Sequence, residues 1–233
     1  MNKVTFIKEL EKIGIIINED QLNKLEIYYN ELIEYNKNVN LTRIVDKNEV
    51  YLKHFYDSLT LIKAIDLNKE STLCDVGTGA GFPGMVLAIV FPTLLVTLVD
   101  ALQKRITFLD LIINKLGLKN VKTVHARIED YAKDNREKYD IVTSRAVANL
   151  RVLSEISIPL VKVNGYFIPM KANIDNEIEE AKDILNKLDC EIENINEFTL
   201  PIEKSTRTLI KIKKYKETSH KYPRRYDLIK NDK

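Results

Sequence analysis

Cysteine and long hydrophobic runs are both scarce in this chain. Its two cysteines, Cys74 and Cys190, lie in different segments, which excludes a disulfide scaffold, a zinc ribbon and a CxxC redox site. The longest apolar runs, residues 85–91 and 94–99, are too short to span a bilayer. The N-terminal segment carries charges throughout and lacks the apolar core of a signal peptide. We therefore expect a cytoplasmic protein without a metal site or a membrane anchor.

The net charge of the chain is small but unevenly distributed. The sequence has 233 residues, 45% of them hydrophobic, enough for one large domain with a sizeable core. The formal net charge is +2, yet residues 201–233 hold eleven Lys and Arg against four Asp and Glu. A basic segment on a nearly neutral body suits a polyanionic partner, although a solvated lysine-rich tail has the same composition.

Hydrophobic periodicity changes near residue 71. Before it, apolar residues recur at helical spacing over residues 3–13, 19–36 and 48–65, which predicts three amphipathic helices. In the second helix, the predicted inward face is Leu22, Leu25, Tyr29, Leu32 and Ile33. After it, short apolar runs predict strands over residues 72–76, 95–99, 121–125, 141–143, 166–170, 192–198 and 208–213. Predicted helices lie between them, over residues 84–91, 103–116, 128–133, 147–161 and 174–188.

Alternating strand and helix patterns predict an α/β fold with a doubly wound sheet. Residues 199–207 are too short for a crossover helix, so the last two strands should form an antiparallel hairpin at the edge of a mostly parallel seven-stranded sheet. We accordingly divide the chain into an N-terminal helical cap (residues 1–66), a Rossmann-like domain (residues 67–215) and a basic C-terminal tail (residues 216–233).

The strongest chemical signal is a glycine-rich loop that follows the first strand and opens a helix. It reads Asp75-Val76-Gly77-Thr78-Gly79-Ala80-Gly81-Phe82-Pro83-Gly84. Glycines at alternate positions let the backbone turn sharply and approach a ligand closely. A dinucleotide site needs G-x-G-x-x-G, but Phe82 stands where the third glycine would be. The pattern therefore favours an adenosine-containing ligand without phosphates.

Three further strand ends carry candidate binding residues. Asp100 ends the second strand, where an acid can accept hydrogen bonds from both ribose hydroxyls, or act simply as a helix N-cap. Ile128 and Glu129 follow the third strand, beside the expected position of an adenine, although acids are also common in any first helical turn. Arg145 ends the fourth strand at the same sheet edge, where a salt bridge is the alternative role.

Together these residues resemble the bacterial small-subunit ribosomal RNA guanine-N7 methyltransferases, also called the glucose-inhibited division protein B family. The likeness covers nearly the whole chain and rests on these motifs: Asn40-Leu41-Thr42, His54 with Asp57-Ser58-Leu59, Asp75 to Gly84, Asp100 with Lys104-Arg105, Arg127 with Glu129, Ser144-Arg145-Ala146, Met170-Lys171 and Tyr222-Pro223-Arg224-Arg225. Two positions depart from the family pattern. Tyr35 stands where members often have tryptophan, and Ala172 stands where glycine is usual.

The resemblance implies a class I S-adenosylmethionine-dependent methyltransferase, monomeric and without an obligate protein partner. Its implied substrate is N7 of a single guanosine (position 527, in the 530 loop) of 16S ribosomal RNA in the small ribosomal subunit. With the glycine-loop argument, it gives cofactor contacts at Asp75, Gly77, Gly79, Phe82, Asp100, Ile128, Glu129 and Arg145. It also implies catalytic positioning by Arg145, His54 and Asn40, and RNA contacts by Lys171, Arg224 and Arg225.

The implied chemistry needs no general base, because guanine N7 has a lone pair and no proton; positioning and electrostatics should dominate. The fourth strand lacks an Asn/Asp-Pro-Pro-aromatic tetrapeptide, which argues against methylation of an exocyclic amine. Neither cysteine ends a strand at the ligand edge, which argues against pyrimidine C5 chemistry. Three alternatives stay open from the residues alone: a small-molecule methyltransferase, a nicotinamide oxidoreductase and a non-catalytic RNA-binding protein.

Overall fold

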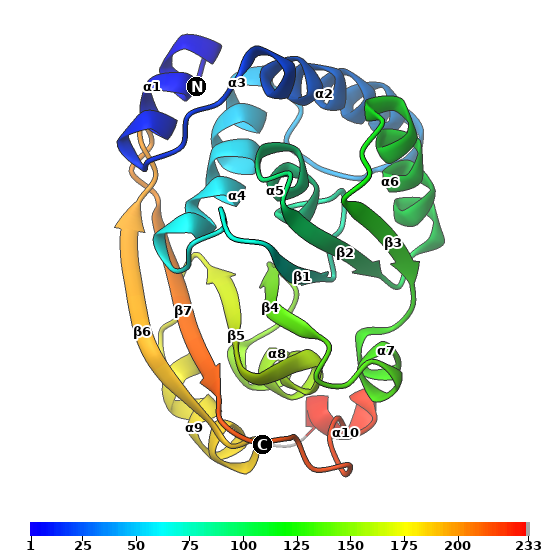
Figure 1. Cartoon of the computed structure of the whole chain (residues 1–233), viewed down its shortest axis with the longest axis vertical. Coiled ribbons are helices and arrows are strands. Elements are labelled where there is room, and N and C mark those ends of the chain that lie inside the picture. Colours follow the sequence, from blue (N-terminus) through cyan, green and yellow to red (C-terminus); the bar gives the residue numbers. More distant parts are fainter. Residues whose placement is uncertain (232–233) are drawn as a thin grey trace.

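A seven-stranded sheet runs through the molecule, with helices on both faces (Figure 1). The computed structural model describes residues 1–231, so the last two residues of the predicted tail lie outside the described residues. The strand order is β3-β2-β1-β4-β5-β7-β6. The strands are β1 (Ser71–Val76), β2 (Leu94–Asp100), β3 (Val121–His125), β4 (Tyr139–Arg145), β5 (Val161–Lys171), β6 (Cys190–Thr199) and β7 (Thr206–Lys214).

The predicted sheet topology is confirmed. Strands β1 to β5 pair in parallel, and β7 lies antiparallel between β5 and the edge strand β6. The fifth strand is longer than predicted and begins at Val161. Its first half was missed because polar residues such as Lys162 and Asn164 interrupt the apolar pattern. The predicted helix from residue 147 was wrong at its start. Ala146 has a φ of 56°, and the helix begins only after Asn149, whose side chain accepts from the Val152 amide.

Two apolar cores lie on opposite faces of the sheet. On one face, α5 (Gly84–Val90) and α6 (Gln103–Leu116) are covered by the N-terminal helices, and every residue of α5 is buried. The other face carries α7 (Ile128–Asp134), α8 (Leu150–Ser157) and α9 (Glu177–Lys187). No helix within residues 1–231 is long and apolar enough to cross a membrane.

The N-terminal helices share their core with the sheet rather than forming one of their own. Helix α1 (Lys3–Lys12) contributes Phe6, and α2 (Glu19–Val39) contributes Leu25 and Tyr28, to the cluster that also holds Phe108 of α6. Tyr29, predicted on the inward face, is partly buried against this cluster, and its neighbour Tyr28, which was not predicted there, is fully buried. We keep the boundary at residue 66 as a proposal.

The predicted regular helix over residues 48–65 is broken. Helix α3 (Lys47–Val50) passes into a π-helical turn (Tyr51–Tyr56), then into α4 (Asp57–Leu59) and a 3₁₀ turn (Thr60–Lys63). Wide π turns are frequent at functional sites. Here the turn buries His54 and Asp57 along with the apolar residues around them, which a 3.6-residue period does not predict.

The segment after β7 folds back along the sheet domain. It ends in α10 (Tyr226–Asn231), which lies beside α7 and α8 in Figure 1. Tyr222 and Ile229 are buried in the second apolar core. Its described part is therefore packed against the domain, in contrast to a solvated tail.

Candidate active site

Two neighbouring hollows open near the carboxyl ends of the parallel strands, where α/β sheets bind ligands. The glycine-loop hollow, about 290 Å³, is lined by Gly77, Asp100 and the start of α7. The cap hollow, about 410 Å³, lies between the π-helical turn and the ends of β4 and β5. Ala146 lines both of them. A ligand in one hollow therefore lies next to a ligand in the other.

Fixed donors hold the acid of the glycine-loop hollow. The Gly79 amide donates to Asp100 Oδ2 over 2.9 Å, and the Leu102 amide donates to Oδ1 over 2.9 Å. Arg105 Nη1 lies 3.0 Å from Oδ2, and Asp100 is only 2% exposed. Gly77 has a φ of 69°, and a Cβ there would lie 2.5 Å from a methyl carbon of Val147. Glycine is thus required where the loop turns into the hollow.

Asp75 lies beneath the glycine loop and does not line either hollow. Its Oδ2 accepts from the Thr78 hydroxyl over 2.6 Å and from the Gly84 amide over 2.8 Å. Its Oδ1 is buried and has no hydrogen-bond partner among residues 1–231. Burial raises the pKa of Asp75 to about 6. The carboxylate therefore holds the loop in shape while keeping one oxygen unsatisfied.

Asp75 should make the stability of the protein depend on pH. Because its pKa rises from 3.8 to about 6 on folding, the folded state binds the proton more tightly. Its contribution to the free energy of unfolding is full below pH 3.8 and is lost as the pH rises through 6, by about 3 kcal/mol. In urea melts, the free energy of unfolding of Asp75→Asn should increase relative to that of the wild type as the pH is raised from 3.8 to 6. A pH-independent difference between the two proteins would contradict this assignment.

The centre of the cap hollow is one carboxylate held by two guanidinium groups. Arg145 Nη1 donates to Asp57 Oδ2 over 3.0 Å, and Arg207 Nε lies 3.1 Å from both Asp57 oxygens. Arg145 Nη1 also donates to the Lys53 carbonyl over 2.9 Å. The lining carries four cations against two carboxylates: Lys53, Arg145, Lys171 and Arg207 against Asp57 and Glu177. The lining residues themselves therefore carry a net positive charge, which suits an anionic ligand, while Lys53 is also paired with Glu49 and Glu203 outside the lining.

His54 forms an uncharged wall of the cap hollow. Its ring stacks on Phe82, with centroids 4.3 Å apart and an interplanar angle of 16°. Its Nε2 lies 3.0 Å from the Thr42 hydroxyl. Burial, and then the nearby charge of Arg145, lower the pKa of His54 to about 3. The imidazole is thus neutral near pH 7, which suits a positioning role better than proton transfer.

The structure brings part of the predicted site together. Gly77, Asp100, Ile128 and Glu129 line the glycine-loop hollow, while His54, Arg145 and Lys171 line the cap hollow. The other predicted residues line neither of the two: Asn40, Asp75, Gly79, Phe82, Arg224 and Arg225.

Two of these other residues support the site from behind. Phe82 packs between His54 and Tyr28. Asn40 ends α2 with a φ of 49°, two residues before Thr42, which contacts His54. Their predicted roles stay predictions.

The three residues predicted to contact RNA differ in how far they are buried and paired with carboxylates of the protein. Lys171 is 11% exposed, lies 2.7 Å from Glu177 Oε2 and donates to the Ala148 carbonyl. Arg224 binds Glu155, whose side chain is fully buried, through Nε at 2.8 Å and Nη2 at 2.7 Å. Arg225 is 77% exposed and pairs with Asp227 at the surface. Arg225 is thus the member of the set best placed to reach a phosphate.

Several residues that shape the site were missed in the sequence. Asp57 was noted only within a family motif, and Arg207 was not singled out, yet they meet across 150 positions of sequence. Tyr28 donates its hydroxyl hydrogen to the Ala80 carbonyl and stacks on Phe82, with centroids 5.5 Å apart. In a regular 3.6-residue helix Asp57 would lie opposite Phe55 and Leu59, so no local pattern indicated that it is buried.

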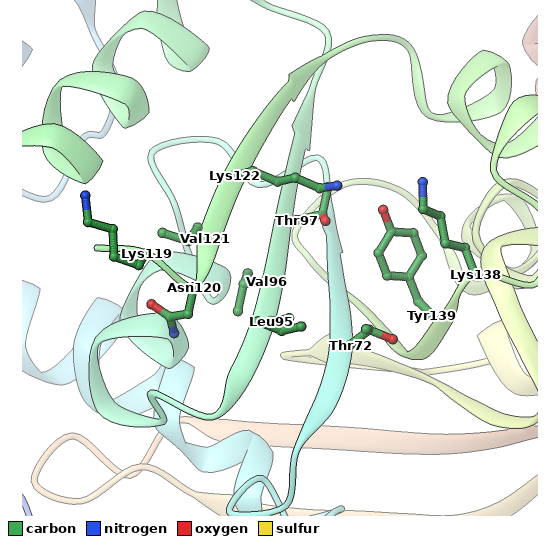
Figure 2. A pocket seen from close by; sticks show the side chains of 10 residues that line it. All are labelled: Thr72, Leu95, Val96, Thr97, Lys119, Asn120, Val121, Lys122, Lys138 and Tyr139. Atoms are coloured by element: carbon green, nitrogen blue, oxygen red, sulfur yellow. The ribbon is translucent and has the colours of Figure 1, made fainter. Parts of the chain in front are cut away.

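A third hollow, about 250 Å³, lies at the opposite end of the sheet (Figure 2). It is lined by residues near the starts of the strands, including Thr72, Leu95 and Tyr139, with Lys122 and Lys138 beside them. None of the predicted site residues lines it. Because ligands of open α/β sheets bind at the carboxyl ends of strands, we assign it no part in the candidate site.

Solved structures share the fold of this chain. M. jannaschii TYW2 in complex with AdoMet matches with a TM-score of 0.54 and 15% identity, over 68% of this chain and 76% of that one. A SAM dependent methyltransferase from Aquifex aeolicus matches with a TM-score of 0.51 and 19% identity, over 77% and 96% of the two chains. The predicted class I methyltransferase fold is thereby confirmed.

Sequence comparison shows the family. The protein of Lactobacillus johnsonii called ribosomal RNA small subunit methyltransferase G is 52% identical over 229 residues, covering 96% of each chain. The Bacillus subtilis protein of that name is 49% identical over 228 residues, covering 97% of this chain and 95% of that one. Residues 21–220 match the family model GidB, described as rRNA small subunit methyltransferase G. This chain therefore belongs to that family.

Proposed function

We propose that this chain transfers a methyl group from S-adenosylmethionine to N7 of a single guanosine, in the 530 loop of 16S ribosomal RNA. The observation that carries the proposal is the pair of neighbouring hollows, which share Ala146 in their linings. One offers an acid and apolar walls for a nucleoside, and the other is positively charged and open to a nucleotide. Family membership supplies the substrate class. The proposal includes action as a monomer in the cytoplasm.

The residues of the glycine-loop hollow fit S-adenosylmethionine better than a dinucleotide. Asp100 offers carboxylate oxygens to ribose hydroxyls, and Ile128 and Ile156 offer apolar contacts to a base. A dinucleotide pyrophosphate needs the free N-terminus of a helix. Here the Gly84 amide at the start of α5 already donates to Asp75, whose negative charge would repel phosphate.

The side chains of the site only need to position the guanine and the cofactor relative to each other. Bound S-adenosylmethionine supplies a methyl group that its sulfonium already activates. Guanine N7 attacks with a lone pair, so a neutral His54 is sufficient beside it. Arg145 offers N–H donors to guanine O6, next to N7, and the Lys53 carbonyl and Asp57 fix its direction. Such preorganised geometry lowers the barrier without any proton transfer.

The test is methyl transfer from labelled S-adenosylmethionine to small ribosomal subunits that lack their native modifications. The RNA is digested and its labelled nucleoside identified by mass. Label in 7-methylguanosine at a single site is the expected result. Label in another nucleoside would keep the cofactor and remove the substrate assignment. Cofactor binding without any transfer to RNA would point to a small-molecule acceptor.

The basic C-terminal segment should contribute to the salt dependence of RNA binding. Replacing Arg224 and Arg225 together by alanine should weaken binding and reduce the slope of log K against log salt by up to about two. Because Arg224 is bonded to buried Glu155, we expect Arg225→Ala alone to reduce this slope by about one. Lys182→Ala, at an exposed site of α9 paired with Glu179 and outside the C-terminal segment, is the control. Anisotropy titrations with a 16S fragment at several KCl concentrations give the slopes, and unchanged slopes would remove the segment from the RNA contacts.

A further inference from the structure

The chain after β7 is fastened to the sheet domain at several points. The Arg136 guanidinium donates to the Tyr222 carbonyl over 2.7 Å and also to the carbonyls of residues 218 and 219. Arg224 binds the buried carboxylate of Glu155 through its backbone amide and its guanidinium. Ile229 is fully buried. These contacts lie on both sides of residue 226 and therefore fix the position of α10.

Tyr226 is the first residue of α10, and it lines the glycine-loop hollow together with Gly77, Asp100 and Ile128. It also lines the adjoining groove between α7 and α10 with Arg127 and other residues. Figure 1 shows α10 beside α7. Arg127, Glu129 and Tyr226 line both the hollow and the groove, so Tyr226 lies where the two meet, near the start of α7.

This placement gives Tyr226 a defined position relative to a bound nucleoside. A ribose held by Asp100 directs its base away from the glycine loop and toward Ile128 at the start of α7. The side chain that reaches this end of the hollow from the C-terminal segment is aromatic and 37% exposed. An aromatic ring at the open side of a base gains stacking and covers it from water.

We propose that Tyr226 is a cofactor-binding residue that forms the outer wall of the adenine end of the S-adenosylmethionine site. This inference rests on the proposed function for the identity of the nucleoside. The match to the family model ends at residue 220, so Tyr226 lies outside the part of the chain that the model describes. The C-terminal segment then has two roles, because it completes the cofactor site as well as carrying positive charge.

The test measures the Kd of S-adenosylmethionine, S-adenosylhomocysteine and 5′-methylthioadenosine by calorimetry on the full chain. Tyr226→Ala should raise all three Kd values by about 5- to 10-fold, because the lost contact is with the adenine that the three share. Tyr226→Phe keeps the ring and should stay within about twofold of the wild type. Leu228→Ala, an exposed residue of the same helix that lines neither hollow, is the matched control. Tyr226→Leu keeps apolar bulk on α10 and should bind as weakly as Tyr226→Ala.

Each contrary outcome separates this inference from the function beneath it. Unchanged Kd values in Tyr226→Ala, with normal binding by the wild type, would overturn the inference and leave the proposed function in place. An equal rise of the Kd values in Leu228→Ala would assign the effect to the fold of the segment and would also overturn the inference. If the wild type bound none of the three nucleosides, the proposed function would fail together with the inference.

Discussion

Arg145→Ala should lower kcat/KM for methyl transfer to the ribosomal substrate by about 100- to 1,000-fold, the usual effect of removing one preorganised donor. The Kd of S-adenosylmethionine should stay within about threefold of the wild-type value. The sequence predicted both a catalytic and a cofactor-binding role for Arg145. The structure places its guanidinium against Asp57 and Lys53 in the cap hollow, and it is absent from the lining of the glycine-loop hollow.

Two variants make this separation of roles measurable. Arg145→Lys keeps the charge but not the planar fork, so most of the loss in kcat/KM should remain. Arg105→Ala removes a cation that lines the glycine-loop hollow and lies 3.0 Å from Asp100, so it should raise the Kd of S-adenosylmethionine more than it changes RNA binding. Single-turnover rates at saturating cofactor isolate the transfer step. A large rise in cofactor Kd for Arg145→Ala, with an unchanged rate at saturation, would reverse the assignment.

The parts of the site that the sequence predicted are those set by neighbours along the chain. The glycine loop, Asp100 and Ile128 lie at or just after the end of a strand, and parallel strands bring their carboxyl ends to one edge. Once the alternating pattern gave the sheet, these residues had to lie close together. The glycine-loop hollow was therefore predictable from local pattern and topology alone.

The cap hollow was harder to predict because distant segments build it. Asp57 meets Arg145 across 88 positions and Arg207 across 150. The π-helical turn shifts the face of the third helix, and aliphatic periodicity does not reveal it. Tyr226 reaches the other hollow only because buried Glu155 and Arg136 hold the C-terminal segment. Charge composition alone predicts a basic tail there and does not indicate that the segment packs against the domain.

Removing the carboxylate of Asp57 should have the largest effect on stability. Asp57 is 3% exposed and is the counter-charge for Arg145 and Arg207, so Asp57→Ala leaves two guanidinium groups facing each other in a buried site. Breaking a buried ion pair from one side destabilises a protein by about 3–5 kcal/mol. Urea melts should therefore show a loss of that size. Asp20→Ala, which breaks an exposed pair with Lys24, should lose less than about 1 kcal/mol.

A double-mutant cycle tests whether this charge cluster joins the N-terminal helices to the sheet. Replacing Arg207 by methionine in the Asp57→Ala background removes one of the two stranded charges, so the double variant should be more stable than the sum of the single losses predicts. Because Phe6, Leu25 and Phe108 share one apolar core, we expect the two parts to unfold together. The ion pairs of Asp57 with Arg145 and Arg207 add an oriented polar contact, because they join α4 to β4 and β7 where a nucleotide would enter. Additive losses would mean that Asp57 and Arg207 act independently and that apolar packing alone holds the helices over the site.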